Sequence, residues 1–253
     1  MNEIAVDRID RAIKQWARRK RALISLSCYA REIEMWGRTA GVRKVRRLLE
    51  IGSGSGWFLV AAVVFGFAGE ATGIDPAIPE AGTQAEDIAN TESVIQEVGL
   101  SDRVHLRSGT FQNILRGSQE PYDLLVFRNV LHHIYPKSGG GTEDKYASRC
   151  VDDLSSARGL FTTAGYVYVV EVDPGSWLWR ATYNLLRTLR GAPTIDWKTK
   201  RTAQEWKRIF EKAGFQSLGL ARLPLHHPLL AAPGVEGLAR VLSQSFLLAG
   251  RAR

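Results

Sequence analysis

The feature that most constrains the fold of this chain is a glycine-rich turn between an apolar run and a helix-like segment. The sequence from 48 to 56 reads LLEIGSGSG, so a short strand leads directly into Gly52, Gly54 and Gly56. Glycine has no Cβ atom, so its backbone can bend tightly and approach a ligand closely while the next helix presents free N–H groups. This order predicts the ligand-binding start of an α/β domain.

Apolar runs that alternate with helical segments follow this loop. Strands are expected at 42–51, 71–75, 104–109, 122–127 and 166–172, with two late strands at 215–223 and 245–252. Helices are expected from about Trp57, at 86–98, and from the capping box Thr202–Glu205 to Gly214. The expected fold class is α/β: a Rossmann-like doubly wound, mostly parallel seven-stranded sheet with an antiparallel C-terminal strand and an N-terminal helical extension.

The positive charge of the chain is concentrated near its N-terminus. The formal net charge is +8, residues 1–47 hold 13 Lys or Arg and 5 Asp or Glu, and the remainder holds 21 of each kind. Apolar residues recur from Ile9 through Ile13, Trp16 and Leu23 at helical spacing. The segment is therefore expected to form an amphipathic helix with basic side chains on its other faces.

Two interpretations of this basic segment stay open. Its field could attract nucleic acid, anionic lipid or an acidic substrate, or its charges could form an ordinary solvated helix face. We expect residues 1–44 to form a basic helical extension or cap and residues 45–253 to form the ligand-binding part of a single domain.

The two cysteines give no sign of a disulfide framework or a structural zinc site. Cys28 and Cys150 lie far apart, and neither has the spacing of metal ligands. The first 20 residues are charged throughout and contain no apolar core of a secretory signal. We expect a cytoplasmic protein without a metal.

One uncharged stretch requires an explanation other than a membrane span. Nineteen uncharged residues separate Glu50 from Glu70, but only WFLVAAVVFGFAG, residues 57–69, is continuously apolar. That length is short for a span and suits a helix buried against a sheet. We expect no transmembrane segment.

An acidic residue at the end of the next strand indicates a nucleoside site. Asp75 lies nineteen residues after Gly56, where a carboxylate can accept hydrogen bonds from both ribose hydroxyls. A dinucleotide fingerprint would require a third glycine where this chain has Trp57, counting from Gly52, or Leu59, counting from Gly54. The bulky side chains argue against NAD and FAD.

The pattern Glu-x-Gly-x-Gly-x-Gly, from 50 to 56, resembles motif I of the class I S-adenosylmethionine-dependent methyltransferases. DLLVFRNVLHHI, from 123 to 134, is similar to the segment that follows the family's fourth strand, and EKAGF, from 211 to 215, also matches. The resemblance covers residues 45–220 and favours the small-molecule branch of the family. It implies S-adenosylmethionine as cofactor and S-adenosylhomocysteine as product.

The resemblance also implies where the cofactor lies. Glu50 and the glycine loop would surround its methionine moiety, Asp75 would hold its ribose beside Ile74 and Pro76, and the end of the fourth strand would lie near the methyl group. Where the family commonly has an acidic residue for the adenine amino group, this chain has Thr110, so Thr110 or the backbone of Phe111 is expected to replace it. The implied cofactor residues are Glu50, Gly52, Ser53, Gly54, Gly56, Asp75, Pro76, Gly109, Thr110, Phe111, Phe127, Arg128 and Asn129.

Methyl transfer is an in-line displacement that needs a base only if the acceptor must lose a proton. His132 and His133 are the candidate catalytic residues because imidazole titrates near neutrality and both follow the fourth strand. The alternative is that each histidine is structural. Glu171, at the end of the fifth strand, is a third candidate.

The acceptor is expected to be a small molecule. Residues 127–130 read FRNV instead of the Asn/Asp-Pro-Pro-Tyr/Phe motif of enzymes that methylate exocyclic or amide nitrogens, and neither cysteine suits a 5-methylcytosine enzyme. Trp177, Trp179 and Tyr183 could form the walls of an acceptor site or pack as the core of a lid. The alternatives are RNA methylation through the basic N-terminal segment and a non-catalytic cofactor-binding or regulatory protein.

Overall fold

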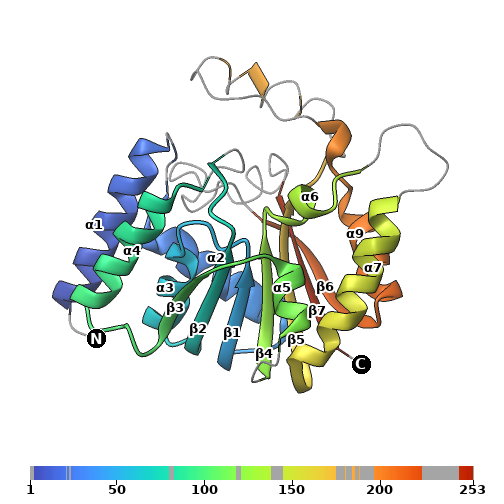
Figure 1. Cartoon of the computed structure of the whole chain (residues 1–253), viewed down its shortest axis with the longest axis horizontal. Helices are drawn as coiled ribbons and strands as arrows, with labels where there is room; N and C mark the ends of the chain where they lie inside the picture. The colour runs from blue at the N-terminus through green and yellow to red at the C-terminus, as the bar shows by residue number, and fades with distance from the viewer. Residues whose placement is uncertain are drawn as a thin grey trace.

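A seven-stranded sheet lies between two layers of helices (Figure 1). The computed structural model describes residues 3–20, 22, 24–79, 83–117, 121–137, 145–174, 180, 184, 185, 188, 197–223 and 245–252. The strands are β1 Val45–Ile51, β2 Ala68–Asp75, β3 Val104–Ser108, β4 Tyr122–Arg128, β5 Phe161–Val172, β6 Phe215–Leu223 and β7 Ser245–Ala252.

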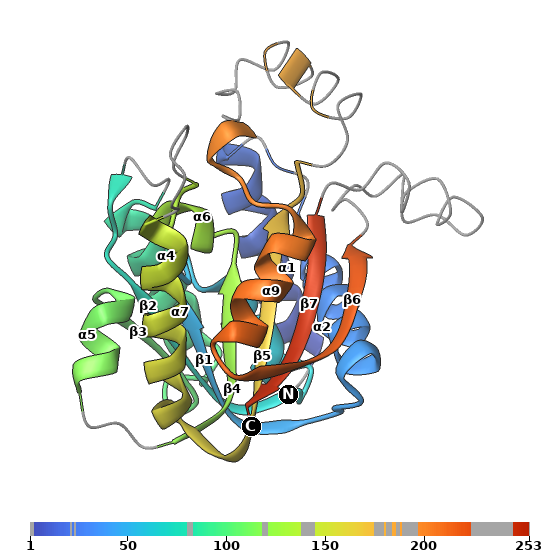
Figure 2. The same cartoon turned by 90° about the vertical axis from the view of Figure 1, so that its right-hand side faces the viewer.

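The strand order is β3-β2-β1-β4-β5-β7-β6. All pairs from β3 to β5 are parallel, and β7 pairs antiparallel with both β5 and β6. Figure 2 shows β6 at the outer edge beside β7. The predicted fold class is therefore confirmed, although β2 and β5 begin earlier than the predicted strands at 71 and 166.

Helices cover both faces of the sheet (Figures 1 and 2). One face carries α1 Glu3–Arg19, α2 Leu26–Ala40, α3 Trp57–Val64 and α4 Ala85–Glu97, and the other carries α5 Phe111–Arg116, α7 Lys145–Ala157 and α9 Ala203–Lys212. The short helix α6, Leu131–Ile134, sits at the end of β4, and single 3₁₀ turns occupy Arg158–Leu160 and Trp197–Thr199.

Alternating side chains of the central strands supply both cores. In β4, Leu124 and Val126 enter the core under α1 to α4, and Leu125 and Phe127 enter the core under α5, α7 and α9. The uncharged stretch after the glycine loop forms α3, whose residues 57–63 are buried, as expected. No helix among the described residues has both the length and the apolar composition needed to cross a membrane.

The N-terminal segment forms two helices, and the sequence predicted only the first. Helix α1 ends at Arg19, and Leu23, which the predicted helix included, lies outside the described residues. Helix α2 has its own apolar stripe of Leu26, Tyr29, Ile33 and Trp36 at three- and four-residue spacing. Both helices pack into the core that α3 and β1 share.

Basic side chains of α1 and of the turn that follows it pair with acidic side chains of α4. Arg8 Nη2 lies 2.7 Å from Glu97, and Lys20 Nζ lies 2.8 Å from Asp87. The apolar face of α1, including Ile9, is buried. Part of the N-terminal charge therefore serves to hold α1 on the domain. The boundary at residue 44 stays a prediction.

Candidate active site

The carboxyl ends of four parallel strands meet at one edge of the sheet. Glu50 of β1 is in register with Val126 of β4, and Arg128 of β4 is in register with Val170 of β5. The next strand on the other side of β1 ends at Asp75. Ligands of open α/β sheets bind outside such an edge, which makes it the candidate site.

The glycine loop after β1 is closely packed at Gly52 and Gly56 and has more space at Gly54. Gly52, Gly54 and Gly56 all have left-handed φ angles, of +68°, +56° and +83°. A Cβ atom on Gly52 would lie 2.2 Å from Val130, and one on Gly56 would lie 2.6 Å from Leu106. Among the described residues, a Cβ atom on Gly54 would meet only the Thr83 hydroxyl, 3.6 Å away. Gly54 is therefore the loop position whose side has room for a ligand.

Asp75 points at the glycine loop. It is buried, and its Oδ2 accepts a hydrogen bond from the Gly54 N–H at 2.9 Å while its Oδ1 accepts one from the Ala77 N–H at 2.8 Å. A carboxylate oxygen has more than one lone pair, so both oxygens can still accept from a ligand. Pro76 follows as an exposed residue, and Ser53 N–H donates to the Ile74 carbonyl at 3.2 Å.

Glu50 and Arg128 belong to a buried cluster that reaches the N-terminal helix α2. Arg128 Nε and Nη2 donate to the two carboxylate oxygens of Glu32 at 2.6 and 2.9 Å, and the Tyr168 hydroxyl donates to Glu32 at 2.6 Å. Arg128 Nη1 lies 3.6 Å from Glu50 Oε1, too far for a hydrogen bond. Within the described part of the chain, neither carboxylate oxygen of Glu50 has a hydrogen-bond partner. The guanidinium also lies over the rings of Phe58 and Tyr29, at 4.5 and 5.2 Å.

These contacts alter the proton affinities of the cluster. Burial raises the pKa of Glu50 to about 8, an effect that Arg128 opposes and that Glu32 and Asp75 reinforce. Burial disfavours the charged form of Arg128, but the Glu32 and Glu50 carboxylates outweigh it and raise the pKa of Arg128. The cluster therefore holds a cation that is hydrogen-bonded to Glu32, beside a second carboxylate, Glu50, that it contacts only at ion-pair distance.

His132 and Glu171 form a hydrogen-bonded pair at the end of β5. His132 Nδ1 lies 2.6 Å from Glu171 Oε2, and the Leu131 N–H donates to Glu171 Oε1 at 2.7 Å. The His133 ring packs beside that of His132, with centroids 4.2 Å apart. Partial desolvation, together with His132 and Lys200, lowers the pKa of His133 to about 4. The two predicted histidines are thus adjacent, and the hydrogen bond to Glu171 distinguishes His132.

The predicted adenine-side residues are used partly by the protein itself. The Thr110 hydroxyl and Asn113 form a capping box at the start of α5, with Thr110 Oγ1 donating to Asn113 Oδ1 at 2.6 Å. The rings of Phe111 and Phe127 are buried with centroids 5.4 Å apart. Their side chains therefore pack in the core, which leaves backbone groups for a ligand. The Gly109 N–H donates to the Asp75 carbonyl at 3.2 Å.

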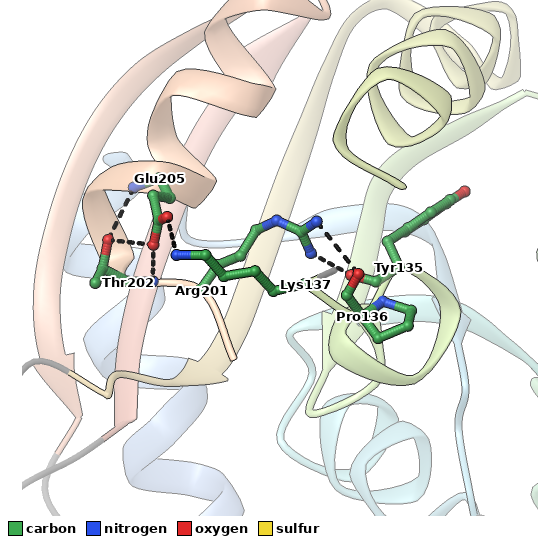
Figure 3. A network of polar contacts seen from close by, with 6 residues as sticks. All are labelled: Tyr135, Pro136, Lys137, Arg201, Thr202 and Glu205. Carbon is green, nitrogen blue, oxygen red and sulfur yellow. Dashed lines mark hydrogen bonds and ion pairs between the residues drawn. The ribbon is translucent and has the colours of Figure 1, made fainter. Parts of the chain in front are cut away.

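A polar clamp fixes the segment that follows α6 (Figure 3). The buried Arg201 guanidinium donates to the backbone carbonyls of Tyr135 and Pro136, and Lys137 Nζ donates to Glu205 Oε1 at 2.6 Å. The clamp connects the end of α6 to the start of α9. The contacts of Arg201 and Lys137 therefore fix the backbone that follows His132.

Two residues of this region were not predicted. Glu32 lies in a helix that the sequence analysis missed, although the apolar stripe of α2 could have located that helix. Arg201 directly precedes the predicted capping box, and no local pattern signals its burial. The predicted acceptor residues Trp177, Trp179 and Tyr183 lie outside the described residues. Within the described part of the chain, no group of His, Cys, Asp and Glu could hold a metal ion.

The residue following β4 has an unusual backbone conformation. Asn129 has a φ angle of +53°, and its N–H donates to the Val170 carbonyl at 2.7 Å. Ala77, after β2, is the other described non-glycine residue with positive φ, at +52°. Such conformations cost roughly 1–3 kcal/mol each and cluster at functional sites, which agrees with the location of both residues at this edge.

The chain matches the family model of a methyltransferase domain over residues 16–219. No curated protein sequence matches it. Its fold is similar to that of an O-methyltransferase family protein from Burkholderia thailandensis, at 12% identity and a TM-score of 0.54, over 87% of this chain and 55% of that one. Geranyl diphosphate methyltransferase, in complex with GPP and sinefungin, matches at 15% identity and a TM-score of 0.55, over 88% and 79% of the two chains.

A SAM-dependent methyltransferase from Aquifex aeolicus matches at 12% identity and a TM-score of 0.54, over 89% of each chain. The chain spans about half the length of several matched structures, the Burkholderia protein among them. At these identities the structural likeness shows the fold, and the family model covers most of the sequence. The chain therefore belongs to the methyltransferase-domain family and has the fold of the class I S-adenosylmethionine-dependent methyltransferases.

Proposed function

We propose that this protein transfers a methyl group from S-adenosylmethionine to a hydroxyl group of a small-molecule acceptor, with His132 as general base. The observation that carries the proposal is the hydrogen-bonded pair of His132 and Glu171, at the sheet edge where Glu50 and Asp75 also lie. An imidazole that a buried carboxylate orients is the arrangement by which a histidine acts as a general base.

The residues present fit the cofactor. The unpartnered carboxylate of Glu50 suits an α-ammonium group, and the Asp75 carboxylate has lone pairs left for ribose hydroxyls. The open side of Gly54 suits a close backbone approach. When bound, the cofactor supplies an activated methyl group on a sulfonium centre, and much of the rate enhancement then comes from aligning the acceptor with it.

His132 is the better base of the two histidines. When Nδ1–H donates to Glu171, the ring presents the lone pair of Nε2 to an acceptor. As the hydroxyl proton moves to Nε2, the Glu171 carboxylate stabilises the imidazolium, and the Leu131 N–H keeps that carboxylate in place. His133, with its pKa lowered to about 4, stays neutral near pH 7 and is a weaker base.

Two observations favour a small molecule over RNA. Arg8 and Lys20 of the basic N-terminal segment are engaged with Glu97 and Asp87, which reduces the charge available to phosphates. Proteins of similar fold include an O-methyltransferase family protein, whose name indicates transfer to oxygen, and geranyl diphosphate methyltransferase, whose name indicates a small-molecule acceptor.

Calorimetry with S-adenosylhomocysteine tests the cofactor assignment. Asp75→Ala should weaken binding by roughly 10- to 100-fold, because the ribose loses a charged acceptor and two backbone N–H groups lose theirs. Asp102→Ala, an exposed acidic residue in the turn before β3, is the matched control and should bind normally. Equal affinity in the two variants would remove Asp75 from the site.

Turnover tests the reaction. The protein is incubated with S-adenosylmethionine and a panel of small phenols, enols and alcohols, and formation of S-adenosylhomocysteine is measured. Methylation of a hydroxyl compound supports the proposal. Methylation restricted to amines or to RNA would overturn the assigned acceptor class while leaving the cofactor assignment intact.

A further inference from the structure

We propose that Glu32 of α2 is a positioning residue of the cofactor site: it engages Arg128 so completely that Glu50 is left to take up the cofactor's α-ammonium group, and cofactor binding thereby releases a proton. The inference rests on the proposed use of S-adenosylmethionine. It makes the N-terminal helix part of the site, although α2 precedes the first strand of the sheet.

Arg128 lies closer to the carboxylate of Glu32 than to the carboxylate of Glu50. Arg128 meets Glu32 through two hydrogen bonds, at 2.6 and 2.9 Å, and meets Glu50 only at 3.6 Å. The Tyr168 hydroxyl adds a third hydrogen bond on Glu32. A two-point Arg–carboxylate contact fixes the orientation of both planes, so Arg128 cannot turn toward Glu50 without losing its contacts with Glu32.

When every group of the cluster is ionised, the cluster carries a net negative charge. Glu32 and Glu50 carry two negative charges against the single positive charge of Arg128, and all three side chains are well buried. Isolating a carboxylate from water without a partner costs several kcal/mol. In the free protein Glu50 avoids this cost by keeping its proton, and in the complex an ammonium group would replace that proton.

The titratable groups that face Glu50 act in opposite directions, and those that favour its protonated form prevail together with burial. Arg128 of β4 favours its ionised form, and Glu32 of α2 and Asp75 of β2 disfavour it. Tyr29 and Tyr168 stay neutral because burial raises the pKa of each. Removing the negative charge of Glu32 should therefore make Glu50 ionise at lower pH.

The decisive experiment measures S-adenosylhomocysteine binding between pH 6 and 9 for the wild type, Glu32→Gln and Glu34→Gln. Glu34 is an exposed residue of the same helix that pairs with Arg38, so it controls for loss of a carboxylate from α2. In the wild type, affinity should rise with pH until Glu50 is ionised. In Glu32→Gln the midpoint should move down by roughly one pH unit or more, as expected when a neighbouring like charge is removed. Glu34→Gln should match the wild type.

A purely structural role for Glu32 would lower affinity equally at every pH without moving the midpoint, and that result would overturn the inference. Because Glu32→Gln could also fail to fold, a second measurement uses the wild type alone. Calorimetry at pH 7 in two buffers of different ionisation enthalpy should show release of about one proton on binding. Binding without proton release overturns the inference but leaves the cofactor assignment standing, whereas absence of binding at any pH overturns both.

Discussion

Two buried glutamates at the same edge of the sheet, Glu50 and Glu171, have opposite surroundings. Both are about 1% exposed, and they lie at the ends of β1 and β5. Both oxygens of Glu171 are engaged, by the Leu131 N–H and His132 Nδ1, whereas neither oxygen of Glu50 has a hydrogen-bond partner among the residues that the structure describes. In the proposed function Glu171 belongs to the acceptor side, which is complete in the free protein, and Glu50 belongs to the cofactor side, which the cation of a ligand would complete.

This difference indicates a different physical role for Glu171 than for Glu50. A satisfied buried carboxylate holds its neighbours in one geometry, as catalysis by an oriented base requires. A buried carboxylate without a hydrogen-bond partner is unfavourable in its ionised form, and a cation that binds beside it removes that cost. We therefore expect substitutions on the Glu171 side to change the rate, and substitutions on the Glu50 side to change affinity and stability.

The largest expected effect concerns His132. His132→Ala should lower kcat by roughly 10²–10⁴-fold, the usual contribution of a general base, and Glu171→Gln should lower it by a similar order because the ring loses its orientation. The affinity for S-adenosylhomocysteine should stay unchanged in both variants. Steady-state kinetics with an accepted hydroxyl compound and calorimetry with the product measure the two quantities separately.

His133→Ala is the matched control for this effect, since its ring lies beside that of His132 but lacks the contact with Glu171. Its kcat should fall much less. If His132→Ala lowered the affinity for S-adenosylhomocysteine by the same factor as kcat, then His132 would affect cofactor binding as well as the rate. That result would contradict the proposed division between an acceptor side and a cofactor side.

The proposed division of the site into a cofactor side and an acceptor side was only partly predictable from the sequence. Asp75 and the glycine loop were predicted because strand, loop and helix are adjacent along the chain, and local patterns indicate such neighbours well, whereas Glu50 was predicted from the resemblance to the family. The pair of His132 and Glu171 joins residues 39 positions apart. Both were candidates, but their contact depends on the register of β4 with β5, which no local pattern encodes.

The Glu32–Arg128 contact was beyond prediction for a similar reason. It joins residues 96 positions apart and requires a second N-terminal helix to lie across the face of the sheet. Charge counting grouped Glu32 with a basic segment, which was interpreted either as a docking surface for partners or as a solvated helix face. In the folded protein the segment supplies instead a carboxylate to the interior, because burial and pairing outweigh the sign of the net charge.

The second prediction concerns stability. The pKa of Glu50 is about 8 in the folded protein and near 4.5 in an unfolded chain, so the folded state holds a proton that the unfolded state releases. Its stabilising contribution is therefore full below pH 4.5 and is lost as pH rises through 8, at about 1.4 kcal/mol per pH unit within that window. Glu50→Gln cannot ionise and should not show this loss.

Thermal unfolding of the free protein at pH 6 and pH 9 measures the difference. The wild type should lose several degrees of Tm more than Glu50→Gln, since about 1 kcal/mol shifts Tm by roughly 2–4 °C in a chain of this size. Glu92→Gln, an exposed residue of α4, should follow the wild type. Parallel curves for wild type and Glu50→Gln would show that Glu50 is already ionised, and the contrast with Glu171 would disappear.

The smallest expected effect concerns Gly54, and it tests whether the glycine loop belongs to the proposed cofactor side together with Glu50. Gly54 and Gly99 both have left-handed φ angles, of +56° and +70°, and an added Cβ atom would make no close contact at either position. Alanine at either position should therefore cost a similar free energy of unfolding, roughly 1–2 kcal/mol, from backbone strain alone. Only Gly54→Ala places its methyl group where the cofactor is expected, so only that variant should also weaken S-adenosylhomocysteine binding. Unfolding curves and calorimetry on both variants separate strain from contact, and equal affinities would mean that the ligand does not approach the loop at Gly54.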